Sequence, residues 1–120
     1  MSVAPSCPAL IVHDDDPFRK ALIAALDQNH FTVTSSTDGP EALKALNERC
    51  FSVVLLGVDL KTGRGLATLE YLRDKRRTSL IIVGIPNPKL RDYAKTAVET
   101  LVKPVDPSYV ARRARVYCGH

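Results

Sequence analysis

The sequence has no long apolar segment. No window approaches the roughly 18 apolar residues that a bilayer-spanning helix needs, and no apolar core follows a basic region near the first residue. We therefore expect a soluble, unexported chain that is cytoplasmic and has no membrane partner. Nucleotide-binding and catalytic motifs are also missing, because the chain contains no GxGxxG, no P-loop and no nucleophile elbow. No nucleophile–base pair is evident, so the sequence does not favour an enzyme.

Cysteine is scarce. Cys7, Cys50 and Cys118 are widely spaced, form no CxxC pattern and leave one thiol unpaired. This pattern argues against a disulfide framework and against a structural zinc site. We predict three thiols without a task, in a reducing compartment.

The charge balance is mildly basic. Seventeen Lys and Arg residues against 13 Asp and Glu residues give a net charge of +4, which favours acidic partners. Arg112, Arg113 and Arg115 form the most basic stretch near the C-terminus, but no aromatic residues are interleaved with them for base stacking. We expect no nucleic-acid partner.

Short apolar runs alternate with helical patterns along the 120 residues. Apolar or β-branched runs predict strands at 9–12, 31–36, 52–57 and 79–84, and a fifth strand from Glu99 that ends at Lys103–Pro104. Apolar residues at helical spacing predict helices at about 17–29, 38–46, 65–76, 90–97 and 106–117. Five strand–helix units without a linker indicate one doubly wound α/β domain over residues 1–120, built on a five-stranded parallel sheet.

The strand at 52–57 organises this sheet. Its uninterrupted apolar run is typical of a strand that is buried on both faces. Ligands of such sheets bind beyond the carboxyl ends of the strands, so the residue at the tip of this strand decides the chemistry. That residue is Gly57, which has no side chain.

Four motifs occur in one order along the chain: LIVHDDDPFR, DGPEALKAL, FSVVLLGVDLKTGRG and LVKP. With these motifs the chain from 8 to 117 resembles the receiver domain of two-component response regulators. The resemblance implies a flavodoxin-like three-layer (βα)5 sandwich with strand order 2-1-3-4-5, in a phosphorelay or related signalling role. It also implies an acidic pocket of Asp14, Asp15, Lys103 and Pro104, with a cis Lys103–Pro104 bond.

Three positions depart from the family pattern. Gly57 stands where the resemblance places the phosphoacceptor aspartate, so no carboxylate nucleophile is present there. Ile85 and Thr100 replace the hydroxyl and aromatic switch residues, and Ile85 cannot donate a hydrogen bond. We predict an atypical pseudo-receiver that acts through protein–protein contact, without phosphorylation and without a required cofactor. The alternative is a phosphorelay regulator that uses an unconventional acceptor such as Asp59.

Two interpretations remain open for the acidic residues. Asp14 and Asp15, with the backbone carbonyl of Asp59, could hold Mg²⁺ with an affinity weaker than millimolar. The favoured interpretation is that Lys103 pairs with the acids in a closed pocket. His13 could join the acids in a metal site, but a hydrogen-bonded and inert histidine is favoured.

The resemblance also implies a partner surface. In the family, the face of the fourth helix, fifth strand and fifth helix dimerises or contacts an output domain. The chain carries basic residues there: Lys89, Arg91, Lys95, Arg112 and Arg113. We expect a homodimer, an output domain or an acidic protein partner on this face.

Replacing Gly57 by Asp is expected to restore a cation site with three carboxylates and to strengthen Mg²⁺ binding.

Overall fold

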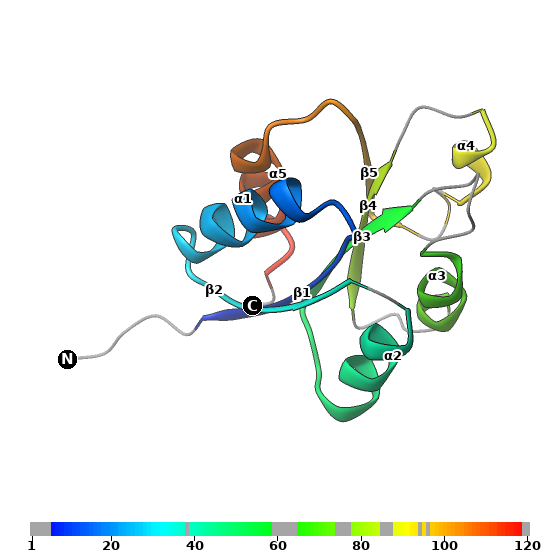
Figure 1. The fold of residues 1–120 in the computed structure, drawn as a ribbon, viewed down its shortest axis with the longest axis horizontal. Coiled ribbons are helices and arrows are strands. Elements are labelled where there is room, and N and C mark those ends of the chain that lie inside the picture. The colour runs from blue at the N-terminus through cyan, green and yellow to red at the C-terminus, as the bar shows by residue number, and fades with distance from the viewer. Residues whose placement is uncertain are drawn as a thin grey trace.

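A five-stranded parallel sheet forms the centre of the molecule (Figure 1). The computed structural model describes residues 6–37, 39–58, 65–73, 78–84, 88–93, 95 and 97–118. The strand order is β2-β1-β3-β4-β5, and each neighbouring pair is parallel. The strands are β1 (Cys7–Val12), β2 (Phe31–Ser36), β3 (Val53–Val58), β4 (Ser79–Gly84) and β5 (Glu99–Val102). The predicted sheet and its strand order are confirmed.

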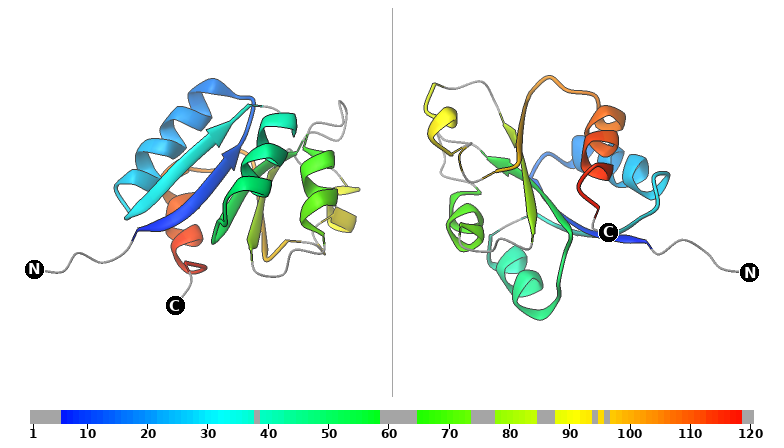
Figure 2. Two further views of the ribbon diagram at one scale, coloured as in Figure 1. Left: turned by 90° about the horizontal axis from the view of Figure 1, so that it is seen from below. Right: turned by 180° about the vertical axis from the view of Figure 1, so that it is seen from behind.

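Helices cover both faces of the sheet. They are α1 (Asp16–Asp27), α2 (Gly39–Glu48), α3 (Leu66–Leu72), α4 (Leu90–Tyr93) and α5 (Pro107–Arg115). The helices α1 and α5 contact each other on one face, whereas α2, α3 and α4 lie on the other side (Figures 1 and 2). The sheet is therefore the middle of three layers, as the flavodoxin-like prediction required. None of the helices in the described ranges has the length and apolar character that a membrane crossing needs.

The core is divided between the two faces of the sheet. Successive side chains of a strand point to opposite faces, so Leu55 packs toward α1 and α5 and Leu56 packs toward α2 and α3. Both side chains are almost fully buried. The central position and two-sided burial of β3 explain why its sequence is an unbroken apolar run.

Capping residues fix where helices α1 and α5 begin. In α1, the Asp15 side chain accepts a hydrogen bond from the backbone N–H of Phe18, and Pro17 occupies the first turn. In α5, Asp106 plays the same role toward Ser108, next to Pro107. A carboxylate at this position satisfies an otherwise unpaired N–H group, and proline loses nothing there.

Three helix predictions were wrong in extent. α3 ends at Leu72, whereas Arg76 was predicted, and residues 74–77 lie outside the described residues. Ala97 is not part of α4, because the next residue, Val98, already donates its N–H to the carbonyl of Leu80 and starts the pairing of β5. Tyr117 lies beyond the end of α5 and is only partly buried.

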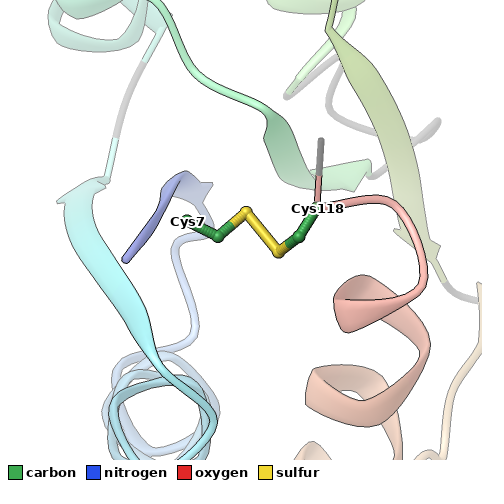
Figure 3. The surroundings of a disulfide bond; sticks show 2 residues. All are labelled: Cys7 and Cys118. Carbon is green, nitrogen blue, oxygen red and sulfur yellow. A yellow bond between two sulfur atoms is a disulfide. The ribbon is translucent and has the colours of Figure 1, made fainter. Parts of the chain in front are cut away.

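The prediction for two of the cysteines was also wrong. Cys7 and Cys118 form a disulfide, with their Cα atoms 5.7 Å apart (Figure 3). Both are buried, whereas Cys50 is free and exposed. Spacing along the chain could not reveal the pair, because 111 positions separate two residues that the fold brings together at the amino end of β1. The cysteine pattern therefore gives no support for a reducing compartment.

Candidate functional site

The residues singled out in the sequence gather at the carboxyl edge of the sheet. Asp14 and Asp15 follow β1, Gly57 lies near the end of β3, and Lys103 follows β5. Because all strands are parallel, their carboxyl ends meet at the same edge, which is where such sheets bind ligands. The Lys103–Pro104 bond is cis, as predicted. Asp59 and Ile85 lie outside the described residues.

Asp15 serves both the helix and the pocket. Its Oδ1 accepts the N–H of Phe18 at 3.1 Å, and its Oδ2 lies 3.7 Å from Nζ of Lys103. The hydrogen bond from Phe18 lowers the pKa of the Asp15 carboxyl, and the Lys103 charge lowers it further. Asp15 is therefore an ionised carboxylate with contacts to both of its oxygens.

Lys103 lies between an acid and an aromatic ring. Its ammonium group is 3.7 Å from Asp15 and 4.4 Å from the centre of the Phe18 ring. An ammonium over a ring face is attracted by the ring's negative face. Both contacts hold the Lys103 side chain on the β1–α1 side of the pocket.

His13 is the buried member of the group, with 7% of its surface exposed. Its Nδ1 accepts the backbone N–H of Asp15 at 3.1 Å and lies 3.8 Å from Oδ1 of Asp14. The imidazole ring also packs against Phe18, with 5.0 Å between ring centres. Burial lowers the pKa of His13, and the nearby Lys103 charge adds to this effect. The ring is therefore neutral at pH 7.

Gly57 is enclosed on two sides. A Cβ atom built on it would lie 2.6 Å from Cδ2, 2.9 Å from Cγ and 3.0 Å from Nε2 of the His13 ring. On another side, Gly65 has a φ of +85°, and a Cβ atom there would overlap the carbonyl oxygen of Gly57. Glycine at both positions lets the backbone and the ring approach this closely.

The magnesium site expected from the sequence lies only partly within the described residues. Among them no group of three His, Cys, Asp or Glu side chains could hold a metal ion. A hard cation needs several oxygen ligands, yet Asp15 already contacts Phe18 and Lys103. The third predicted ligand, Asp59, lies outside the described residues.

A second charged group lies at the amino end of β5. Glu99 accepts hydrogen bonds from Nε of Arg113 at 2.6 Å, from Nη2 of Arg113 at 3.0 Å and from the hydroxyl of Tyr117 at 2.7 Å. Hydrogen bonds from Arg113 lower the pKa of Glu99. The hydrogen bond that the Tyr117 hydroxyl donates to Glu99 raises the pKa of Tyr117. Arg113, which the sequence placed on the partner surface, is thus engaged within the chain. Arg112 is exposed.

Sequence reasoning missed the contact between His13 and Gly57. A glycine inside a buried apolar strand often marks a close approach of another group, and this signal was available. The identity of the approaching residue was not available, because it depends on the register between β1 and β3.

Thr100, the other predicted switch position, lies in β5 opposite Ile82 and is half-buried.

Comparison with known proteins agrees with this geometry. The family model described as "Response regulator receiver domain" matches residues 9–115. The chain therefore belongs to the response regulator receiver domain family. It is a receiver domain that functions in signal transduction, as its motifs indicated.

Similar proteins come from several bacteria. The transcriptional activator protein PfeR of Pseudomonas aeruginosa is 33% identical over 103 residues, which is 83% of this chain and 34% of PfeR. The transcriptional regulatory protein SrrA of Staphylococcus aureus is 27% identical over 109 residues, which is 88% of this chain and 45% of SrrA. The chain thus spans less than half of the curated relatives it matches.

A solved structure supports the fold. The receiver domain of the Francisella response regulator 1452 superposes with a TM-score of 0.81 and 21% sequence identity. The match covers 93% of this chain and 96% of that domain.

Proposed function

We propose that this receiver domain is a pseudo-receiver, which transmits its signal by docking to a protein and not by accepting a phosphoryl group. The observation that carries the proposal is the contact between Gly57 and His13. Residue 57 has no carboxylate, and the imidazole ring fills the place where a side chain would begin. Receiver phosphorylation needs a carboxylate nucleophile, and Asp14 and Asp15 already contact neighbouring groups. In this role the chain performs no catalytic step and requires no cofactor.

Phosphorylation in vitro tests this proposal. The protein would be incubated with acetyl phosphate and Mg²⁺ and then weighed intact by mass spectrometry, with a phosphorylatable receiver domain as the positive control. We expect no phosphate adduct. An adduct that disappears in an Asp59→Asn variant would establish the unconventional acceptor and overturn the proposal.

The proposed docking surface is formed by α4, β5 and α5. Val98, Val102 and Val116 are about half exposed, at 48%, 47% and 58%, although valine is usually buried. Arg91 of α4 and Arg112 of α5 are also exposed. Exposed apolar residues and exposed cations on the same three elements suit a partner that offers both apolar and acidic groups. The transcriptional roles in the names of PfeR and SrrA support an output domain as one such partner.

The state of association tests whether a second copy can be the partner. We expect sedimentation velocity to show concentration-dependent dimers that Val102→Asp weakens. Lys44→Glu, an exposed change on α2, is the matched control and should leave the dimer intact. A monomer at every concentration would remove the homodimer and leave the output domain or a separate protein.

A further inference from the structure

His13 and Gly57 are neighbours on one face of the sheet. Val12 of β1 pairs with Leu56 of β3, and extending this register by one residue brings His13 beside Gly57. Side chains alternate along a strand, so both positions share the face of Ile11 and Leu55, which is the face covered by α1 and α5.

The imidazole is held in this position by several contacts. The N–H of Asp15 binds its Nδ1, and Phe18 packs on the ring. The backbone of the same residue is fixed as well, because Nη1 of Arg19 donates a hydrogen bond to the His13 carbonyl at 3.1 Å. A ring with 7% exposure would lose its contacts with Asp15 and Phe18 if it swung out to solvent.

We propose that His13 is a positioning residue that plugs the acidic pocket, because its ring occupies the volume that a side chain at residue 57 requires. The inference rests on the proposed function and deepens it. The pocket is closed by two residues together, not by the loss of a carboxylate alone. His13 fixes Asp15 through its backbone N–H, and Asp15 in turn contacts Lys103.

One consequence concerns restoration of the site. An aspartate at residue 57 must displace the ring, because real Cβ atoms are not found 2.6 Å from ring carbons. Removing the ring at the same time frees the volume that the aspartate needs. The single change Gly57→Asp is therefore insufficient, although the sequence alone suggested that it would strengthen Mg²⁺ binding.

Magnesium binding tests whether Gly57→Asp needs the simultaneous removal of the His13 ring. Wild type, His13→Ala, Gly57→Asp and the double variant would be titrated with Mg²⁺ by calorimetry. We expect the double variant to bind at least about tenfold more tightly than Gly57→Asp, and His13→Ala to match wild type. Equal affinities of Gly57→Asp and the double variant would overturn the plug.

A steric cycle keeps the inference testable if Gly57→Asp does not fold. Gly57→Ala adds only the Cβ atom, and we expect it to lower the melting temperature by about 5–10 °C in the His13 background. In the His13→Ala background the loss should be less than half as large. Equal losses in both backgrounds would show that the ring does not contact residue 57, and would end the proposal.

The two proposals fail separately. A phosphate adduct on the wild-type protein would contradict the pseudo-receiver and leave the thermal cycle unchanged. Additive melting temperatures would contradict the plug and leave the phosphorylation result as it stands.

Discussion

The two ends of the sheet are held together in different ways. At the amino end, a disulfide joins the first residue of β1 to Cys118, and Glu99 at the start of β5 binds Arg113 and Tyr117. At the carboxyl end, the contacts are the fit of His13 against Gly57 and the 3.7 Å pair of Lys103 and Asp15. A covalent bond fixes chain segments whatever side chains surround it. Steric fit fails with one added atom, so small sequence changes alter the carboxyl end most readily.

The disulfide should give the largest single effect, and its removal tests whether the amino end is held covalently. In the chain-entropy model, a cross-link that closes a loop of about 100 residues lowers the entropy of the unfolded chain and so raises the free energy of unfolding by about 4–5 kcal/mol. We expect Cys118→Ser to lower the free energy of unfolding by a similar amount in urea titrations. Cys50→Ser, at the exposed free cysteine, should change nothing. If Cys118→Ser unfolds at the same urea concentration as the wild type, the amino end is not held by this bond.

Gly65→Ala tests the steric end of the comparison. Its φ of +85° strains any other residue, and the new Cβ would overlap the carbonyl oxygen of Gly57. We expect a loss of about 1–3 kcal/mol in the free energy of unfolding. Ala67→Ser, at an exposed position in α3, is the control. A neutral Gly65→Ala would show that the chain around Gly57 is less tightly packed than its contacts indicate.

The sequence predicted the sheet well because apolar periodicity records burial directly. The strands at 31–36 and 79–84 were located to the residue, and β3 was recognised as the central strand. The fifth strand was predicted to continue to the Lys103–Pro104 step, whereas β5 ends at Val102. The end of α4 was missed, because helical spacing from Leu90 to Ala97 does not show that the backbone of Val98 pairs with β4. Periodicity describes one segment at a time. It does not show whether the backbone of that segment will form helical hydrogen bonds or pair with a neighbouring strand.

The sequence predicted which residues belong to the site, but not how they contact one another. Asp15 and Lys103 were named from the sequence, and the structure brings them within 3.7 Å. The filling of residue 57 by His13 depends on strand register, and the disulfide depends on two segments meeting in space. Both are long-range relations that no local pattern contains. The positions of Asp59 and Ile85 lie outside the described residues.

Glu99→Gln tests the amino end without touching its covalent bond. The substitution keeps the shape of the side chain but removes the charge that Arg113 and Tyr117 bind, so we expect the melting temperature to fall by a few degrees at pH 7. Because the folded state lowers the pKa of Glu99, its contribution is present above the ordinary value of 4.5 and is lost as pH falls through the folded pKa. The difference between variant and wild type should therefore shrink in acid. A constant difference would assign the loss to packing.

Titration of His13 should give the smallest effect, and it sharpens the comparison by perturbing the carboxyl end alone. Burial and the Lys103 charge lower its pKa below the ordinary 6.5, so the unfolded chain binds a proton more readily than the folded one. The stabilising contribution is then complete above 6.5 and is lost as pH falls from there toward the folded pKa. Melting temperatures measured between pH 7.5 and about 5 should fall more in the wild type than in His13→Asn, which cannot gain a charge. Cys118→Ser changes only the other end of the sheet, so it should retain the wild-type slope. Parallel curves for wild type and His13→Asn would mean that the ring is already charged or is open to solvent, and that the carboxyl end is not held by a neutral, packed imidazole.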